Sequence, residues 1–150
     1  MMVYLVILSV LIFDQLTKNI ILNEMVTPKI IEVTPFFNLI LAFNTGVSFS
    51  MFSGNNPYVL SAIALSVCAL IAWWLTKEQD KITRIGFAMI IGGALSNVLD
   101  RFMYGAVVDF LDFYIGSYHW PAFNIADTAI CIGAGLIVLR SFLLKKEEEK

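Results

Sequence analysis

Charged residues interrupt apolar segments that are long enough to cross a membrane. Asp14 and Lys18 stand in the first such segment. Asp100 and Arg101 close the third, and Asp127 opens the fourth. A charge at the centre of a membrane helix costs about 2.5–3.5 kcal/mol on insertion scales. Charges that are kept at this cost, and spaced to share helix faces, indicate a polar site inside a membrane protein.

The composition agrees with a membrane location. Hydrophobic residues make up 59% of the 150-residue chain, charged residues 15%, and the mean hydropathy is +0.79. Soluble domains have about 45–50% apolar and about 25% charged residues. The net charge of -2, without a basic stripe, excludes nucleic acid as the expected partner. We expect one integral membrane domain over 1–150, a monomer in contact with membrane lipid.

The cysteines and the lone histidine do not form a metal site. Cys68 and Cys131 lie midway along apolar segments, where we expect two packed thiols, and a disulfide would require their helices to align. His119 is the only histidine and stands in an aromatic run, so no ligand-spaced cluster exists. No metal and no other cofactor is predicted. The first segment lacks a basic start and a signal-peptide cleavage pattern, so we expect it to remain as a helix.

Four segments have the length and apolarity of membrane spans, for which about 17–25 residues are needed. The predicted spans are 1–22, 58–75, 85–102 and 122–144. The predicted fold class is therefore an all-α membrane protein with four transmembrane helices. Arg140 lies near the end of the last span, where its side chain is long enough to place the charged head at the interface.

The two longest segments between the spans have patterns of their own. Segment 23–57 is apolar and β-prone, and it is punctuated by Pro and Gly, which predicts a short twisted sheet on the membrane face. Segment 103–121 alternates aromatic and acidic residues, which is typical of an interfacial strand or short helix.

Basic residues gather on one side of the predicted membrane. By the positive-inside rule, the 76–84 loop and both termini are cytoplasmic, and 23–57 and 103–121 face outward. The basic residues on the cytoplasmic side are Lys77, Lys81, Arg84, Arg140, Lys145, Lys146 and Lys150.

The polar residues of the first and third spans share helix faces near the outer ends. Asp14 and Lys18 are four residues apart, which fits equally an ion pair that eases burial and a functional pair. Asn97, Asp100 and Arg101 form one polar corner, which is either an interhelical clamp or a binding site. The planar fork of Arg101 suits a carboxylate or a peptide carbonyl. Gly92 and Gly93 just before this corner permit close helix packing.

Other polar residues lie at the same outer level. Asn124 and Asp127 fit the start of a helix. Asp109 and Asp112 can be solvated surface acids, and for Asp112 this is the preferred interpretation. Asn44 begins a sequence typical of a turn, with Ser48 close behind. Each group alone fits a structural role, but their common depth is what a single site requires.

Two carboxylates at such a site can divide acid and base work between them. When they approach closely, one stays protonated and the other ionised. The base takes a proton from water, and the acid hydrogen-bonds a carbonyl and later helps to protonate a leaving amine. A serine triad is disfavoured because His119 is the only imidazole. A Ser–Lys dyad of Lys18 with Ser48 or Ser96 is possible, but Asp14 beside Lys18 would keep the amine protonated.

Five ordered sequence blocks resemble the lipoprotein signal peptidases, the type II signal peptidases of bacterial membranes. Each block alone is weak, and their order over nearly the whole chain is specific. The blocks are Asp14-Gln15-Leu16-Thr17-Lys18, Asn44-Thr45-Gly46-Val47-Ser48-Phe49, Gly92-Gly93-Ala94-Leu95-Ser96-Asn97-Val98-Leu99-Asp100-Arg101, Val107-Val108-Asp109-Phe110 and Phe123-Asn124-Ile125-Ala126-Asp127.

The resemblance implies an aspartic endopeptidase of the bacterial inner membrane, with Asp109 and Asp127 as the catalytic pair. The expected substrate is a prolipoprotein whose cysteine carries diacylglycerol, cleaved just before that cysteine. The cyclic peptide antibiotic globomycin is the expected inhibitor. By the same match, residues that line the site are Asn44, Asn97, Arg101 and Asn124, and residues that support its shape or substrate binding are Asp14, Lys18 and Asp100.

The chain departs from the family pattern in two places. Ser96 stands where the family usually has Gly, and Val47-Ser48 replace a pair of alanines. We expect altered packing near Asn97 and intact chemistry.

Two other classes of protein remain as alternatives. A transporter or proton relay also uses intramembrane acids, but it would place polar groups through the full depth and often carries inverted repeats. A non-catalytic membrane scaffold would use every pair structurally. Cleavage of lipidated and unlipidated precursor separates these alternatives from a peptidase.

Overall fold

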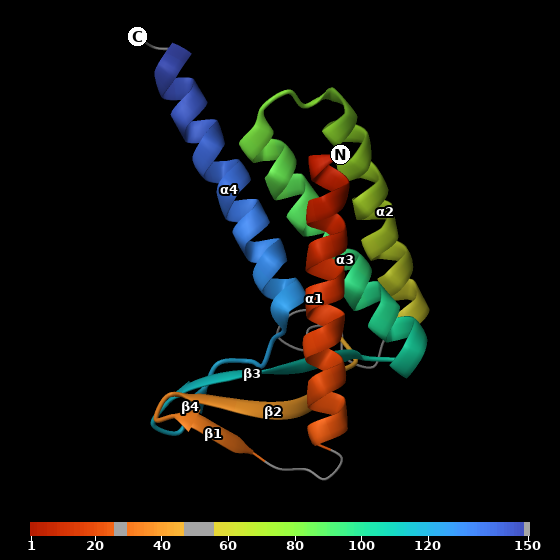
Figure 1. Ribbon diagram of the computed structural model, residues 1–150, viewed down its shortest axis with the longest axis vertical. Coiled ribbons are helices and arrows are strands. Elements are labelled where there is room, and N and C mark those ends of the chain that lie inside the picture. The colour runs from red at the N-terminus through yellow and green to blue at the C-terminus, as the bar shows by residue number, and fades with distance from the viewer. Residues whose placement is uncertain (26–29, 47–55, 149–150) are drawn as a thin grey trace.

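The computed structural model describes residues 1–25, 30–46 and 56–148 and contains four long helices (Figure 1). All four are long and apolar enough to cross a membrane, the last over Ile125–Leu144. These helices confirm the four predicted spans to within a few residues at most ends. They are α1 (Met2–Glu24), α2 (Pro57–Lys77), α3 (Lys81–Tyr104) and α4 (Ile125–Glu148).

Local sequence signals set the ends of the helices. Asn56 precedes α2, and its side chain accepts a hydrogen bond from the backbone N–H of Tyr58. Asp80 precedes α3 and accepts from the N–H of Thr83 at 2.9 Å. Gly105 ends α3 in the left-handed conformation, with φ of 72°, which a residue without Cβ adopts at no steric cost. The chain therefore turns directly from α3 into the next strand.

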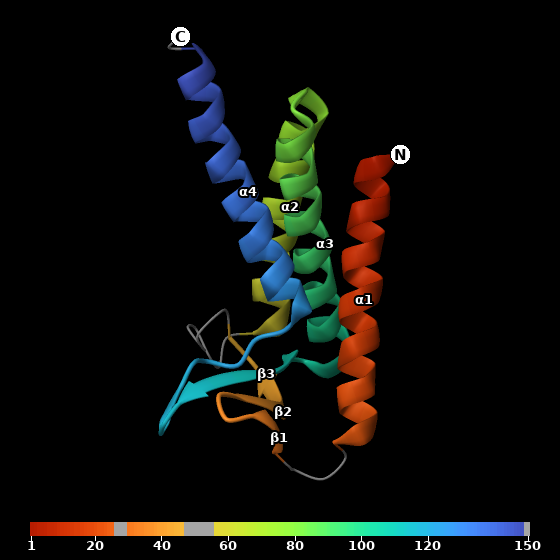
Figure 2. The ribbon, with the colours of Figure 1, turned by 60° about the vertical axis from the view of Figure 1, so that its left-hand side comes forward.

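A small antiparallel sheet lies at one end of the helices (Figures 1 and 2). Its strands follow the order β1 (Ile31–Thr34), β2 (Phe37–Asn44), β3 (Val107–Ile115) and β4 (Tyr118–His119). The sheet predicted in segment 23–57 is confirmed over β1 and β2, and segment 103–121 contains strands rather than a short helix. The sequence did not predict that the two segments pair with each other, because strand pairing between distant segments leaves no local pattern.

Helix α3 is the central helix and packs against α1, α2 and α4 (Figure 2). Close approach depends on glycine, as predicted. A Cβ on Gly92 would lie 2.9 Å from the backbone oxygen of Ile7 in α1. A Cβ on Gly93 would collide with the backbone oxygen of Ala126 in α4. These two glycines allow α1 and the start of α4 to pack closely against neighbouring faces of α3.

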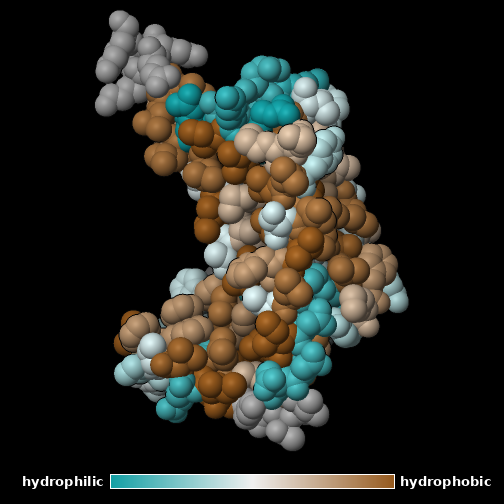
Figure 3. All heavy atoms as spheres, in the orientation of Figure 1, coloured by the Kyte–Doolittle hydropathy of each residue, from teal (hydrophilic) through white to brown (hydrophobic). Residues whose placement is uncertain are grey.

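The outer surfaces of the helices are mainly apolar (Figure 3). The cysteines differ from each other, since Cys68 is buried and Cys131 is exposed. Both are free, so the expectation of two packed thiols is wrong for Cys131. The reason is that the face of α4 carrying Cys131 borders an open groove instead of another helix.

The end of the helices that lies away from the sheet holds a group of partly exposed, interacting polar residues. Arg140 reaches Asp80, with its Nε 2.9 Å from Oδ1. Arg84 donates from Nη1 to the backbone oxygens of Leu75 and Glu78 at 3.1 and 2.7 Å, which satisfies carbonyls at the end of α2. These contacts join α2, α3 and α4 at the end that is farthest from the sheet (Figure 1). We refer to it as the loop end, and to the other as the sheet end.

Candidate active site

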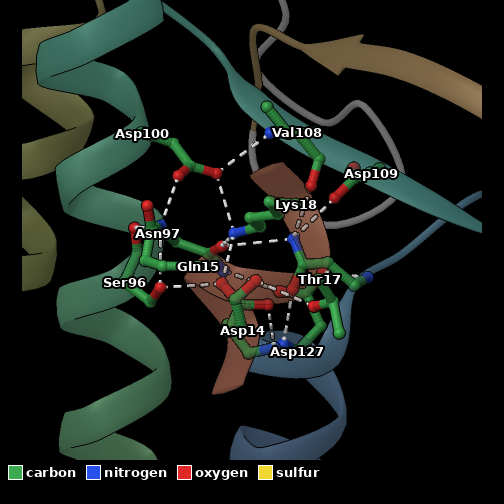
Figure 4. A network of polar contacts seen from close by, with 12 residues as sticks. Asp14, Gln15, Thr17, Lys18, Ser96, Asn97, Asp100, Val108, Asp109 and Asp127 are labelled. Atoms are coloured by element: carbon green, nitrogen blue, oxygen red, sulfur yellow. Dashed lines mark hydrogen bonds and ion pairs between the residues drawn. The ribbon is translucent and has the colours of Figure 1, made fainter. Parts of the chain in front are cut away.

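A buried ion cluster lies at the sheet end, between α1 and α3 (Figure 4). Lys18 Nζ is 2.6 Å from Asp14 Oδ2 and 2.7 Å from Asp100 Oδ2, and it donates to Asn97 Oδ1 at 3.0 Å. The three charged side chains are 0–1% exposed. Charges buried this deeply are tolerated only when they are paired and hydrogen-bonded. The predicted Asp14–Lys18 pair is therefore present, and Asp100 completes it.

Asp109 and Asp127 come from different elements and are joined through two amide side chains. Asn124 Nδ2 donates to Asp109 Oδ1 at 2.7 Å and to Asn97 Oδ1 at 3.2 Å. Asn97 Nδ2 donates to Asp127 Oδ1 at 2.9 Å. Because both asparagines are held by further contacts, the two carboxyl groups have a defined relative position.

Asn124 and Asp127 also start α4. The backbone N–H of Asp127 donates to Asn124 Oδ1 at 2.8 Å, and the N–H of Asn124 lies 3.4 Å from Asp127 Oδ2. This reciprocal pattern is a capping box. The helix-start interpretation of these two residues is therefore confirmed, and the structure also places Asn124 against Asp109 and Asn97, and Asp127 against Asn97. The side-chain oxygen of Asn124 accepts the capping hydrogen bond of α4, and its side-chain nitrogen donates to Asp109.

The turn after β2 forms another wall of the site. Asn44 Nδ2 donates to Asp109 Oδ2 at 3.0 Å, and Asn44 Oδ1 accepts from the N–H of Gly46 at 2.9 Å. Arg101 Nη2 donates to the oxygen of Gly46 at 2.9 Å, and its Nη1 to the oxygen of Asn97 at 3.3 Å. The residues of the predicted polar corner of α3 therefore have different partners. Asp100 contacts Lys18 of α1, and Arg101 contacts this turn. Val47 and Ser48 lie outside the described residues.

The environment of Asp109 favours its protonated form. Burial raises the pKa of Asp109 to about 7, and the nearby charge of Asp127 adds to the increase. The amides of Asn44 and Asn124 and the charge of Lys18 oppose it. Near neutral pH this carboxyl can hold or release a proton, as an acid–base catalyst must.

A groove of about 790 Å³ opens beside these residues. Asn97, Arg101 and Asp127 lie along it as polar lining, whereas its other walls are mostly apolar. An apolar groove with a few polar groups suits a ligand that is itself mostly apolar. The remaining lining residues come from α2, α3, α4, the ends of β2 and β3, and the segment before α4: Asn44, Val59, Leu60, Ile63, Ala64, Val67, Ile90, Ala94, Val107, Trp120, Pro121, Ala122, Phe123, Thr128, Ile130, Cys131 and Ile132.

Asp112 does not belong to this site, and the expectation that it is a solvated surface acid is wrong. Its side chain is buried, accepts from Asn38 Nδ2 at 3.0 Å, and lies 2.8 Å from His119 Nδ1. Pairing between β2 and β3 sets Asn38 opposite Asp112. Residues three apart in a strand point to opposite faces, so Asp112 points away from Asp109. His119 is half exposed and stacks on Tyr114 with ring centroids 5.0 Å apart.

Sequence reasoning missed the hydrogen bonds that Gln15 and Ser96 make, although it had disfavoured Ser96 as a nucleophile. Ser96 Oγ donates to Asp14 Oδ2 at 2.7 Å, and Gln15 Nε2 donates to Ser96 Oγ at 3.0 Å. The hydroxyl proton of Ser96 is therefore directed at a carboxylate, and the Lys18 ammonium lies between two carboxylates. This geometry speaks against Ser96 and Lys18 as a nucleophile and its base. The unused signal was the four-residue spacing of Ser96 and Asp100, which puts both residues on one face of the helix.

The depth of the buried charges distinguishes between classes of membrane protein. Among the described helical residues, the fully buried charged side chains are Asp14, Lys18 and Asp100, all at the sheet end. A proton relay would need such groups through the depth of the membrane. A paired-carboxylate site at one end, beside an apolar groove, defines the class of a multi-pass membrane enzyme.

The sequence comparisons name the family. The profile of the family described as "Signal peptidase (SPase) II" matches residues 6–143. The chain is 52% identical over 125 residues to a "Lipoprotein signal peptidase" of Vibrio vulnificus (strain CMCP6), which covers 80% of this chain and 74% of the relative. It is 45% identical over 145 residues to one of Alteromonas mediterranea, covering 92% and 80%. The chain belongs to the signal peptidase II family and is therefore a membrane peptidase.

A solved structure has the same fold. It is described as "Bacterial membrane enzyme structure by the in meso method at 2.3 A resolution" and superposes with a TM-score of 0.87 at 33% identity. The match covers 99% of this chain and 91% of the other. This confirms the predicted fold class, four membrane helices with a small sheet region.

Proposed function

We propose that this peptidase is an aspartic endopeptidase that removes signal peptides from prolipoproteins, cutting just before the diacylglyceryl-modified cysteine. The observation that carries the proposal is the linkage of Asp109 to Asp127 through Asn124 and Asn97, with Asp127 lining an apolar groove. The relatives carry the name lipoprotein signal peptidase, which supports this substrate class.

The proposed reaction divides acid and base work between the two carboxyl groups. Asp127, on the wall of the groove, takes a proton from water while the water oxygen bonds to the scissile carbonyl carbon. Asp109, whose pKa of about 7 lets it keep a proton, supplies a hydrogen bond to the carbonyl oxygen. The C–N bond of the tetrahedral intermediate then breaks, and the leaving amine takes a proton from the pair. Asn97 and Asn124 hold both carboxyl groups during these steps.

The proposed substrate reaches the groove from within the bilayer. Its signal helix is apolar and its cysteine carries lipid, so both match a groove whose walls are mostly apolar. We place the sheet end at the outer face and both termini in the cytoplasm, because Lys77 and Lys81 flank the α2–α3 loop, and Arg84 and Arg140 contact Glu78 and Asp80 in that loop. In this arrangement a monomer in the bacterial inner membrane suffices, and globomycin acts as a cyclic peptide that competes for the groove.

The proposal is tested with Asp109→Asn and Asp127→Asn in the full-length, membrane-inserted protein. Each change keeps the shape and removes the titratable group, so cleavage of a lipidated precursor falls by about 10³-fold. Asp112→Asn is the matched control, since it alters a buried acid of the same strand on the other face and leaves cleavage near the unaltered rate. We expect unlipidated precursor to remain uncleaved, because the lipid is part of the proposed substrate. We expect globomycin to inhibit cleavage of the lipidated precursor, because it competes for the groove. Full cleavage by either Asp109→Asn or Asp127→Asn would refute the aspartic mechanism.

A further inference from the structure

Two buried carboxylates hold the backbone immediately before the proposed catalytic pair. Asp14 Oδ1 accepts a hydrogen bond from the N–H of Ala126 at 2.8 Å. Asp100 Oδ2 accepts one from the N–H of Val108 at 3.1 Å. Each N–H belongs to the residue that precedes one member of the pair, Asp127 in α4 or Asp109 in β3. The separation of the two holding carboxylates therefore influences the separation of the pair.

The first connection between the two holding carboxylates is Lys18. Its ammonium lies 2.6 Å from Asp14 Oδ2 and 2.7 Å from Asp100 Oδ2. Two carboxylates and one ammonium leave one negative charge in excess, so the ammonium alone does not neutralise the cluster. Further hydrogen-bond donors are needed to stabilise it.

The second connection consists of Ser96 and Gln15 (Figure 4). Ser96 Oγ donates to Asp14 Oδ2 at 2.7 Å, and Gln15 Nε2 donates to Asp100 Oδ1 at 2.7 Å. The same Gln15 nitrogen donates to Ser96 Oγ at 3.0 Å. A hydroxyl can donate and accept at once, and an amide nitrogen carries two protons, so this connection uses the donors of both groups.

The position of these residues separates a role in geometry from one in substrate binding. Ser96 is completely buried, and Gln15 is partly buried against it. The residues described as lining the groove include neither of them. Ser96 and Gln15 instead contact Asp14 and Asp100, so any effect of theirs on the reaction is transmitted through these two carboxylates.

We propose that Gln15 and Ser96 are positioning residues for the peptidase reaction, which together fix the spacing of Asp14 and Asp100 and thereby of Asp127 and Asp109. The inference rests on the proposed function, because it assumes that Asp109 and Asp127 are the reacting pair. It also gives a role to Ser96, which is a departure from the family pattern expected from the sequence. Glycine at this position would leave Asp14 Oδ2 without its hydroxyl donor.

The test uses Ser96→Ala, Gln15→Met and the double variant in the full-length protein, with lipidated precursor as substrate. Displacement of reacting groups by a fraction of an ångström lowers kcat, and we expect a loss of about tenfold in each single variant. KM stays within about twofold because the groove is unaltered. Since the two residues share one connection, the double variant loses no more than the more affected single variant. The alkaline limb of the kcat profile moves to lower pH, because a wider pair repels less.

The controls separate positioning from general destabilisation. Ser61→Ala removes another buried serine hydroxyl, which donates only within its own helix to the Pro57 oxygen at 2.8 Å, so kcat is unchanged. Three results would overturn the positioning role. They are a wild-type kcat in both Ser96→Ala and Gln15→Met, a rise in KM without a loss of kcat, and losses that multiply in the double variant. Asp127→Asn is assayed in parallel. Its full activity would overturn the proposed function itself, whereas its inactivity beside a normal Ser96→Ala and Gln15→Met would overturn only the positioning role.

Discussion

The two ends of the helices carry the same kind of interaction in opposite surroundings. At the sheet end, Lys18 lies among Asp14, Asp100 and Asn97 with the charged side chains 0–1% exposed. At the loop end, Arg140 meets Asp80 at 2.9 Å, with side chains 22% and 19% exposed. Water screens the second pair and not the first. An ion pair at the loop end is inexpensive, whereas the cluster at the sheet end is tolerated only with every partner in place.

This difference shows where function and orientation are encoded. The sheet end keeps costly charges together, next to a groove, and this is the property of a site. The loop end keeps more exposed basic residues, on which the proposed orientation of the helices in the membrane rests. Four predictions, in decreasing order of expected effect, test the contrast.

The largest effect is expected from removing the buried ammonium. Lys18→Met leaves two carboxylates unpaired in the interior, and the free energy of unfolding falls by about 3–5 kcal/mol. Arg140→Met at the loop end, a change of the same chemistry, lowers the unfolding temperature far less. Thermal or detergent-induced unfolding of both purified variants measures the difference. Equal destabilisation would show that the two ends do not differ in the way described.

The next effect concerns the glycines through which α3 contacts α4 near each end. A Cβ on Gly93 would collide with the oxygen of Ala126, and a Cβ on Gly86 would lie 2.7 Å from that of Gly133. We expect both Gly93→Ala and Gly86→Ala to cost about 1–3 kcal/mol of stability through overpacking. Only Gly93→Ala should also lower kcat, because Ala126 adjoins Asp127. Gly135→Ala, where a Cβ meets open space, is the control. Equal loss of kcat in both variants would contradict a site confined to the sheet end.

The two ends are also expected to respond to pH in opposite directions. Because the pKa of Asp109 is raised to about 7, the folded state keeps a proton that the unfolded chain releases above about 4. Stability from this group is complete below that value and is lost as the pH rises through about 7. Activity that needs the protonated carboxyl falls about tenfold per pH unit beyond the same point.

Asp80 has the reverse sign. The hydrogen bond from the Thr83 N–H, followed by that from Arg140, lowers the pKa of Asp80. Its contribution is present above the ordinary value of 3.8 and is lost as the pH falls through its folded-state pKa. Unfolding curves from pH 3 to 9 for the unaltered protein, Asp109→Asn and Asp80→Asn separate the two. In the Asp112→Asn control, the loss of activity above about pH 7 should be unchanged. This result would support Asp109 as the group whose deprotonation causes the loss.

The smallest effect is expected at the loop end in high salt. The Asp80–Arg140 pair is exposed enough to be screened, so Asp80→Asn changes the unfolding temperature slightly at low ionic strength and not measurably at 1 M salt. The Lys18 cluster should be insensitive to the same salt, because its charges are out of contact with water. A strong salt dependence of both would remove the contrast between the ends.

The helices were largely predictable from the sequence, and so was the set of polar residues that the structure brings together, but the contacts among these residues were not. Hydropathy located the four spans, and the four-residue spacing located the Asp14–Lys18 pair. Asp112 was misjudged because its burial depends on Asn38, which lies 74 residues earlier in the chain. Gln15 was overlooked because its partners, Ser96 and Asp100, are on another helix. Partners at such separations leave no trace in local composition.

The sequence by itself determined the four apolar spans and the shared depth of the polar residues, because both depend on the order of polar and apolar residues along single segments. Only the tertiary structure decided which partners each acidic side chain contacts. Pairing of β2 with β3 turns Asp109 toward Asn124 and Asp112 toward Asn38. Packing of α1 and α4 on α3 brings Asp14 to the N–H of Ala126 and Ser96 to Asp14. Register and helix packing are long-range properties, and they alone convert a set of buried charges into a site with two defined carboxyl groups.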